Sequence, residues 1–422
     1  MSKGFNDFNL SVEVLNAISE MGFEEPTAIQ KSTIPPAMEG FDVIGQAQTG
    51  TGKTVAFGIP VIEKGKRGKI PYAIILTPTR ELAVQVAKEL NRIGKNKGIL
   101  SVPIYGGQPI EKQIGTLKKG VDIVVGTPGR VIDHIKRKTL VLKNARILVI
   151  DEGDEMLNMG FVNDIERIIK ELPLPAERQT MLFSATLPDE IMRIASKYMN
   201  NPKEVSVDSG NKVVQKIKQV FYEVSEGSKI SALTTLLNVG EQSLTLVFCH
   251  TKREVDRVSG KLQKMGYIAG AIHGDFRQSH RDSMMDKFKR GDIEILVATD
   301  VAARGLDIPD ISHVVNYNIP QDPNRYIHRI GRTGRAGRTG MASTFVTPGE
   351  HRQLSLIERS AKTRIHKGKL PESTPENTPG NTEVKKEAVM GVRSGYNRIE
   401  HKKILPMSGS SYKKRRFRSY EA

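Results

Sequence analysis

The composition of this sequence excludes an intramolecular disulfide framework, because its 422 residues include only one cysteine. Scarce cysteine also fits a reducing compartment. The one cysteine, Cys249, directly follows the apolar run 244–248. We therefore interpret Cys249 as a buried strand residue rather than a nucleophile.

Long apolar segments are missing as well. No run of about 18 apolar residues occurs, and the first residues, 1–7, lack the apolar core of a signal peptide. We therefore expect a cytoplasmic protein that does not span a membrane.

Acidic residues are too few to balance the basic ones, since 47 Asp and Glu accompany 64 Lys and Arg and the net charge is +17. Such an excess indicates a polyanionic partner, and we expect nucleic acid. An anionic membrane surface is the alternative. It is disfavoured because the sequence has no basic amphipathic helix with large apolar residues.

The apolar residues that are present recur in short continuous runs between helical patterns. Three of these runs, 72–76, 122–125 and 147–150, predict strands that are buried on both faces. Buried strands that alternate with helices are typical of a parallel sheet in an α/β fold. The length of the chain allows two domains of this kind.

The second half of the chain repeats the spacing of the first half. Segments 72–77 and 122–127 match segments 244–249 and 294–299 at one shared offset, 172 residues. A duplicated lobe explains the offset, and a coincidence of generic α/β spacings is the alternative. The offset pairs Thr79 with Thr251, Arg80 with Lys252, and Thr127 with Thr299.

The segment 46–54 matches a phosphate-binding loop, although Ala47 replaces the first glycine of the general pattern. A short β-branched run precedes the segment and the apolar run 55–61 follows it, so it lies where a strand would turn into a helix. Gly50 and Gly52 allow backbone N–H groups to approach an anion closely. A glycine-rich turn before an ordinary helix is the alternative.

Four side chains carry the predicted phosphoryl-transfer chemistry. Lys53 would reach the β- and γ-phosphates of ATP, and the Thr54 hydroxyl would hold Mg²⁺. Asp151 and Glu152 end an expected strand, where Asp151 would hold Mg²⁺ through water and Glu152 would polarise the attacking water. Capping of a surface helix is the alternative role of this acidic pair.

Positive charge for the transition state would come from the segment 328–338, in which four arginines alternate with glycines. A constitutive RNA-contacting loop is the alternative.

Taken together, residues 5–365 resemble one family, the DEAD-box ATP-dependent RNA helicases of helicase superfamily 2. The resemblance implies two tandem RecA-like parallel-sheet lobes, with ATP between them and single-stranded RNA across both.

A short polar segment between the halves and the loss of apolar periodicity after about residue 369 set the expected domain boundaries. We place an ATP-binding lobe at 1–208, a linker at 209–216, a second helicase lobe at 217–368 and a disordered basic tail at 369–422. The tail has 12 Lys and Arg against 6 Asp and Glu, and it ends with aromatic residues among the charges. We expect it to tether RNA without reading sequence, and a solvated tail that improves solubility is the alternative.

The resemblance assigns nucleotide contacts to several motifs. Gln30 and Thr27 would read the edge of the adenine, and Phe23 would pack on its ring. Asp307, rather than the nearby Asp300, would bind the ribose. The cradle for the phosphates would consist of Gln48, Thr49, Gly50, Thr51, Gly52, Lys53 and Thr54.

Coupling between hydrolysis and RNA is assigned in the same way. Arg332 and Arg335 correspond to arginine fingers, and His328 would meet Asp154. The residues expected to link hydrolysis to unwinding are Asp154, Ser184 and Thr186.

The RNA contacts implied by the resemblance lie in both lobes. In the first lobe they are Pro78, Thr79, Arg80, Gly106, Gly107, Thr127, Gly129 and Arg130. In the second lobe they are Thr251, Gln278, Arg281 and Thr299.

The motif that gives the family its name departs from the usual Asp-Glu-Ala-Asp, because Gly153 stands in place of alanine. All three acidic side chains remain, so the chemistry should survive. The glycine can loosen the segment that holds Asp154, and neutral drift is the alternative. A third account is a backbone conformation that only glycine can supply. His250, Ser279 and His280 also stand where other residues were expected, and the sequence suggests no mechanism for them.

We therefore expect RNA-dependent ATP hydrolysis that parts RNA duplexes locally. Two other functions stay open. One is an ATP-gated RNA clamp whose slow hydrolysis only times release, and the other is a DNA translocase.

Overall fold

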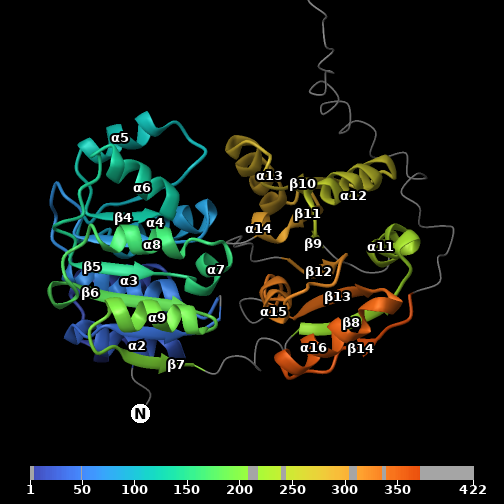
Figure 1. Ribbon diagram of the computed structural model, residues 1–422, viewed down its shortest axis with the longest axis horizontal. Helices are drawn as coiled ribbons and strands as arrows, with labels where there is room; N and C mark the ends of the chain where they lie inside the picture. Colours follow the sequence, from blue (N-terminus) through green and yellow to red (C-terminus); the bar gives the residue numbers. More distant parts are fainter. Residues whose placement is uncertain are drawn as a thin grey trace, which may run out of the picture. The chain divides into compact units, whose positions relative to one another are not determined.

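The computed structural model describes residues 4–48, 50–207, 217–238, 244–303, 311–334 and 339–370. Two seven-stranded sheets form the centres of two lobes, and helices pack on the faces of each sheet (Figure 1). The prediction of two tandem RecA-like parallel-sheet lobes is confirmed.

The first sheet has short strands that are mostly buried. They are β1 (Val43–Gln46), β2 (Ala73–Leu76), β3 (Ser101–Ile104), β4 (Ile123–Gly126), β5 (Ile147–Ile150), β6 (Gln179–Ser184) and β7 (Lys203–Ser206). Their order across the sheet is β3-β4-β2-β5-β6-β1-β7, and neighbouring strands run parallel. Every residue of β2, β4 and β5 is buried, as predicted for strands covered on both faces.

Helices cover both faces of this sheet. They are α1 (Val12–Glu20), α2 (Ala28–Glu39), α3 (Lys53–Lys64), α4 (Arg80–Ile93), α5 (Ile110–Lys118), α6 (Pro128–Lys136), α7 (Gly153–Asn158), α8 (Val162–Ile169) and α9 (Asp189–Tyr198), with 3₁₀ turns η1 (Phe5–Phe8) and η2 (Pro175–Glu177). Successive strand residues point to opposite faces. Ile75 accordingly shares a core with α1 to α4, whereas Ile74 shares one with α6, α8 and α9.

The second lobe is built in the same way. Its strands are β8 (Ile217–Glu223), β9 (Thr245–Cys249), β10 (Ala269–Ile272), β11 (Ile295–Thr299), β12 (His313–Asn316), β13 (Gly340–Val346) and β14 (His366–Lys367). Its helices are α11 (Lys229–Asn238), α12 (Lys252–Lys264), α13 (Gln278–Arg290), α14 (Asp300–Ala303), α15 (Pro323–Ile330) and α16 (His351–Ala361), with 3₁₀ turns η3 (Glu226–Ser228) and η4 (Pro348–Glu350). Cys249 is fully buried at the end of β9, as predicted.

The two sheets share one topology. The second has the order β10-β11-β9-β12-β13-β8-β14, which is the order of the first sheet with each strand replaced by its counterpart. β2 and β9 occupy equivalent places, and so do β4 and β11, which are the pairs that the shared offset predicted. A duplicated lobe therefore explains the repeat better than coincidence.

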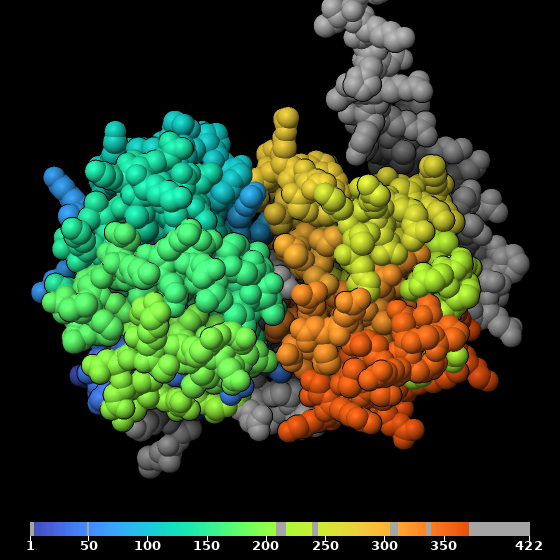
Figure 2. All heavy atoms as spheres, viewed as in Figure 1, coloured from blue at the N-terminus to red at the C-terminus, as the bar shows by residue number. Residues whose placement is uncertain are grey.

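The described chain has two further features. Within the described ranges no helix combines the length and the apolar character that a membrane span requires. In the space-filling view, the yellow and gold segments that contain α12 and α13 lie at the molecular surface (Figure 2).

Candidate functional site

The predicted phosphate loop lies between β1 and α3. Gly50 and Gly52 have φ angles of 80° and 95°, in the left-handed region that residues with a Cβ avoid. Lys53 begins α3, and its buried ammonium lies 3.1 Å from the carbonyl oxygen of Ala47. The loop therefore combines a buried cation with the N–H groups of a helix N-terminus, an arrangement that can hold a phosphate.

Gln30 connects the first turn of α2 to the phosphate loop. Its Oε1 accepts a hydrogen bond from the Thr27 N–H at 2.8 Å, and its Nε2 donates to the Gly52 carbonyl at 3.1 Å. A Cβ at position 52 would lie 2.5 Å from Gln30 Nε2, so glycine is required there for space as well as for conformation. The ring of Phe23 is 36% exposed, which leaves it accessible.

The acidic pair after β5 is buried at the carboxyl edge of the sheet. Asp151 is 2% exposed and Glu152 is 7% exposed. Burial raises the pKa of the Asp151 carboxyl, and the Lys53 ammonium acts in the opposite direction. Glu152 has a φ of 54°, a left-handed conformation that is uncommon for glutamate and that often occurs at functional sites.

The residues predicted to bind Mg²⁺ suit that ion chemically. Asp151 offers a buried carboxylate, and Thr54 offers a hydroxyl in the first turn of α3. The described residues contain no group of three or more His, Cys, Asp or Glu side chains that could form a complete protein cage for a metal. Mg²⁺ does not need such a cage, because it retains waters and binds nucleotide phosphates together with one or two protein oxygens.

Asp154 joins the loop after β5 to the loop after β6. Its backbone N–H donates to Ser184 Oγ at 3.0 Å. Its Oδ2 accepts hydrogen bonds from both the N–H and the Oγ1 of Thr186, each at 3.0 Å. The structure thus brings together the three residues that were predicted to couple hydrolysis to unwinding.

The predicted RNA residues of the first lobe gather where β2 and β3 end. Thr79 Oγ1 accepts a hydrogen bond from the Leu82 N–H at 3.2 Å and so caps α4. The Arg80 guanidinium lies against Gly107, where an added Cβ would be 2.1 Å from Arg80 Nη1. Gly106 lies beside the same guanidinium, so Arg80 and the glycine pair form one cluster.

The remaining predicted residues of this lobe lie at the start of α6 and before α4. Thr127 precedes α6, and Gly129 in its first turn is exposed. The Arg130 guanidinium donates to the Gln108 carbonyl at 3.0 Å, so it supports the loop after β3. Pro78 is buried and shapes the turn after β2.

Thr251 and Thr299 occupy the equivalent edge of the second sheet. Thr251 Oγ1 accepts a hydrogen bond from the Glu254 N–H at 3.2 Å and caps α12, as Thr79 caps α4. Thr299 Oγ1 accepts from the Ala302 N–H at 3.4 Å. Thr79 and Thr251, which the offset pairs, therefore have the same local role, whereas Thr127 precedes α6 without a capping hydrogen bond from its side chain.

Gln278 and Arg281 contact residues of the first lobe. Gln278 Oε1 accepts from Arg80 Nη1 at 3.0 Å, and Arg281 Nη2 lies 2.6 Å from Glu81 Oε1. The sequence analysis did not assign a role to Glu81. The only sequence feature that could have predicted a role for Glu81 is its position directly after Arg80, because nothing in the local pattern identifies its partner Arg281.

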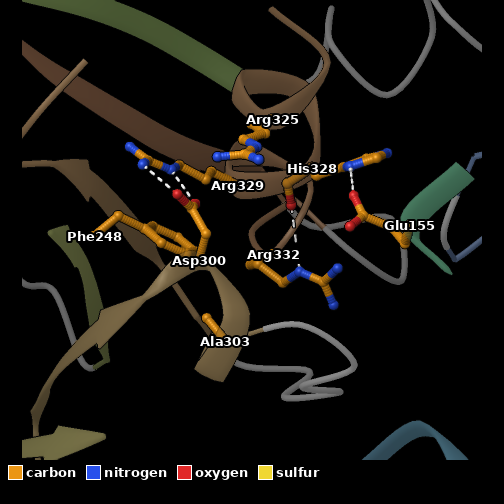
Figure 3. Close-up of a pocket in the computed structure, with 8 residues that line it drawn as sticks. All are labelled: Glu155, Phe248, Asp300, Ala303, Arg325, His328, Arg329 and Arg332. Atoms are coloured by element: carbon orange, nitrogen blue, oxygen red, sulfur yellow. Dashed lines mark hydrogen bonds and ion pairs between the residues drawn. The ribbon is translucent and has the colours of Figure 1, made fainter. Parts of the chain in front are cut away.

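Arg329 and Asp300 form a buried pair in the second lobe (Figure 3). The two guanidinium contacts to the carboxylate measure 2.5 Å and 2.8 Å, and a third donates to the Asn318 carbonyl at 2.7 Å. Because Arg329 is 2% exposed and bonded on several sides, this pair stabilises the lobe rather than binding ribose. Asp307, to which the resemblance assigns the ribose, lies outside the described residues.

The expected contact between His328 and Asp154 is not found. His328 Nδ1 instead lies 2.8 Å from Glu155 Oε1 (Figure 3). Asp154 is hydrogen-bonded to Thr186. The physical reason is that the Asp154 carboxylate already accepts hydrogen bonds from Thr186 in the loop after β6. The His328 imidazole therefore contacts the next acidic residue along α7, which is Glu155. Arg332 lies beside this pair, with its Nε 3.3 Å from the His328 carbonyl oxygen.

Three predicted site residues, Thr49, Asp307 and Arg335, lie outside the described residues, and so do the linker 209–216 and the tail beyond residue 370.

Comparison with known proteins identifies both lobes. Residues 27–194 match the family model of DEAD/DEAH box helicases, and residues 228–337 match the helicase conserved C-terminal domain. The chain is 54% identical to the DEAD-box ATP-dependent RNA helicase CshA of Geobacillus kaustophilus (strain HTA426), over 87% of this chain and 78% of that protein. It is 51% identical to CshA of Bacillus subtilis (strain 168), over 88% of this chain and 75% of that protein.

The chain belongs to the DEAD-box family of ATP-dependent RNA helicases. Among solved structures, it resembles S. cerevisiae Dbp5 bound to RNA and ADP BeF3, with 34% identity and a TM-score of 0.80 over 87% of this chain and 96% of that one.

The glycine that departs from the name of the DEAD-box family begins α7. An added Cβ at Gly153 would lie 3.4 Å from Ile191 Cδ1 and 3.7 Å from the Phe183 carbonyl oxygen, which are ordinary contact distances. Its φ is not in the left-handed region. This DEAD-box protein could therefore accommodate the usual alanine at this position without rearrangement.

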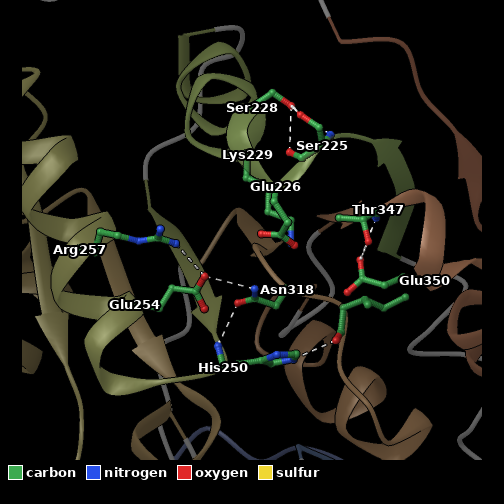
Figure 4. Close-up of polar contacts among 11 residues, drawn as sticks. Ser225, Glu226, Ser228, Lys229, His250, Glu254, Arg257, Asn318, Thr347 and Glu350 are labelled. Carbon is green, nitrogen blue, oxygen red and sulfur yellow. Dashed lines mark hydrogen bonds and ion pairs between the residues drawn. The ribbon is translucent and has the colours of Figure 1, made fainter.

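His250, which had no role at the sequence level, fastens two loops of the second lobe (Figure 4). Its backbone N–H donates to Asn318 Oδ1 at 3.0 Å, and its Nε2 lies 3.0 Å from the Ile319 carbonyl oxygen. Asn318 in turn donates to Glu254 at 3.3 Å. His250 thus holds the end of β9 against the segment after β12, a structural role.

Lys229 shows how the second lobe of this DEAD-box protein differs from the first. It begins α11 after β8, as Lys53 begins α3 after β1, but its ammonium is buried 2.6 Å from the Glu226 carboxylate (Figure 4). The Lys229 ammonium therefore already has a carboxylate partner in its own lobe.

Proposed function

We propose that this chain couples RNA-stimulated ATP hydrolysis to local unwinding or remodelling of RNA duplexes and RNA-protein complexes. The junction between Asp154 and Thr186 carries the proposal, because it connects the end of β5 to the loop after β6. The relatives named ATP-dependent RNA helicases, and the likeness to Dbp5 bound to RNA and ADP BeF3, support it.

The first lobe would hold ATP through groups that are already in place. Lys53 and the loop N–H groups would bind the phosphates, while Gln30 and Thr27 would contact the adenine. Thr54 and Asp151 would hold Mg²⁺, which when bound would neutralise charge on the phosphates. Glu152 would orient the attacking water as general base, at the buried edge of the sheet.

Positive charge at the transferred phosphoryl group would come from Arg332 and Arg335 of the second lobe. The contact between His328 and Glu155 supports a role for this segment in sensing α7, the helix that also contains Asp154. We include Asp307 as the ribose contact.

RNA would lie along the carboxyl edges of both sheets. The hydroxyl oxygens of Thr79, Thr251 and Thr299 accept hydrogen bonds from backbone N–H groups, so each hydroxyl hydrogen can donate to a phosphate oxygen. Contacts of this kind hold the backbone of RNA without reading its sequence.

We propose a cytoplasmic protein with lobes at 1–208 and 217–368, and a tail that tethers RNA.

Two substitutions test the ATP site. Lys53→Ala removes the cation that holds the phosphates, so nucleotide affinity should fall by at least tenfold. Glu152→Gln keeps the shape of the side chain and removes its charge, so ATP binding should remain while turnover falls by at least a hundredfold. Binding and RNA-stimulated hydrolysis are measured on the same preparations, and parental turnover by Glu152→Gln would contradict the assignment.

The two other functions make different predictions for strand displacement. A helicase should part RNA duplexes only with hydrolysable nucleotide, whereas an ATP-gated clamp should bind RNA without parting it. A translocase should prefer long DNA duplexes. Displacement assays on matched RNA and DNA duplexes, with ATP and with a non-hydrolysable analogue, separate the three.

A further inference from the structure

Three rings form a continuous stack in the segment between β10 and α13. The rings of His273 and Phe276 have centroids 4.2 Å apart and are inclined by 30°. Those of Phe276 and His280 have centroids 4.6 Å apart and are inclined by 26°. His273 is 5% exposed and His280 is exposed, so the stack leads from the core of the second lobe to its surface.

The inner end of the stack is fixed. His273 Nδ1 accepts a hydrogen bond from the Asp275 N–H at 3.3 Å, so its Nε2 carries the proton and donates to Asp256 Oδ1 at 2.9 Å. Packing and these two bonds hold the His273 ring in one orientation. Phe276 and His280 are therefore stacked on a rigid base, and the exposed ring loses little freedom when it binds a ligand.

The stack adjoins the RNA edge of the second lobe. Since β10, β11 and β9 are neighbouring parallel strands, their carboxyl ends meet at one edge of the sheet. Thr251 and Thr299 lie at this edge, and the stack follows β10 directly. An ion pair of 2.7 Å between Lys252 and Asp275 connects the residue after Thr251 to the stacked segment.

We propose that the exposed face of His280 is a stacking platform for one nucleobase of the bound RNA. Of the ring contacts among described residues, the contact with Phe276 is the one that His280 makes, and because His280 is exposed, the other face of its ring is left available to a ligand. A flat, exposed and rigid ring beside a phosphate-binding edge suits a base, because each base has a π-face whatever its sequence. The proposal rests on the proposed function, since it adds a base contact to RNA held through its phosphates.

The test uses the full chain and a set of single-stranded RNAs that each lack the base at one position. For the parent protein, removal of one particular base should weaken binding by about five- to tenfold, the lower end of the range for stacking. His280→Ala should weaken binding of the complete RNA by the same factor and should be insensitive to that base. His280→Phe keeps a flat ring and should restore the parental pattern.

His351→Ala is the matched control, because His351 is an exposed histidine of the same lobe whose ring meets Phe221 edge to face, at 6.3 Å. It should bind every RNA of the set as the parent does. Equal effects of base removal on the parent and on His280→Ala, with tight RNA binding by both, would overturn the platform and leave the proposed function intact. Failure of the parent to bind any RNA would instead contradict the proposed function.

Discussion

Glu152 and Gly153 are neighbours with opposite backbone properties. The glutamate has a left-handed backbone that glycine would adopt more easily, and the glycine has a conformation that alanine could adopt. Strain is therefore located at the proposed general base and not at the residue that departs from the family name. Of the consequences considered for Gly153, a strict requirement for glycine is excluded by the geometry.

The effect of Gly153 is predicted from its place in the first turn of α7. Glycine costs about 0.5–1 kcal/mol relative to alanine in regular structure, which corresponds to about a two- to fivefold change in an equilibrium. Gly153→Ala should stiffen the segment that holds Asp154 and lower the RNA concentration for half-stimulation of the ATPase by that factor. ATP affinity without RNA should not change, and both quantities are measured by titration.

Gly115→Ala is the control for this prediction. Gly115 lies within α5, is exposed and has open space around its Cα, so alanine there stabilises a helix that has no contact with Asp154. If both variants changed the RNA requirement equally, the effect would reflect general stability. Loss of activity in Gly153→Ala would contradict the contact distances around that residue.

At the scale of elements, a buried histidine joins two strands of the second sheet. His313 of β12 is fully buried, and its Nε2 lies 2.8 Å from Ser343 Oγ of β13. Burial lowers the pKa of His313 from 6.5 to about 4. The unfolded chain therefore takes up a proton below about pH 6.5 that the folded protein does not accept until about pH 4.

This difference predicts how stability depends on pH. The contribution of His313 to the free energy of unfolding is fully present above about pH 6.5 and should be lost as the pH falls towards 4, by at most about 3 kcal/mol. His313→Gln cannot take up the proton, so its free energy of unfolding should fall less steeply over this range. Denaturant unfolding of the second lobe at several pH values measures the slope, with His366→Gln on the exposed β14 as the control. Identical slopes for the parent and His313→Gln would refute the prediction.

At the scale of the whole molecule, two lobes with one strand order have different tasks. In the first lobe the Lys53 ammonium contacts a backbone carbonyl and is proposed to bind a phosphate, whereas in the second lobe Lys229 pairs with Glu226. We therefore expect no phosphate site at Lys229, because a buried ammonium that already has a carboxylate partner gains little from a phosphate.

The excess positive charge of the tail predicts that the tail contributes to the salt dependence of RNA binding. Removal of 369–422 takes away 12 basic residues against 6 acidic ones. Each phosphate contact that is lost should lower the salt slope of single-stranded RNA binding by about 0.7, so truncation should flatten the slope while turnover at saturating RNA barely changes. Replacement of Tyr412, Phe417 and Tyr420 by serine keeps the charge and should leave the slope unchanged. A truncated protein with the parental slope would indicate that the tail serves solubility.

The sequence by itself determined those parts of this protein that depend on local pattern. The phosphate loop at 46–54 and the strand at 147–150 were predicted at their observed places, because loop glycines and buried strands leave signals within a few residues. The repeat at a fixed offset predicted the second sheet. Only the tertiary structure decided the partners of individual side chains, such as His328 with Glu155 and Arg281 with Glu81. These partners are far apart in the sequence, and which of two adjacent carboxylates contacts a distant side chain depends on how packed elements place them within a few ångströms, which no local pattern records.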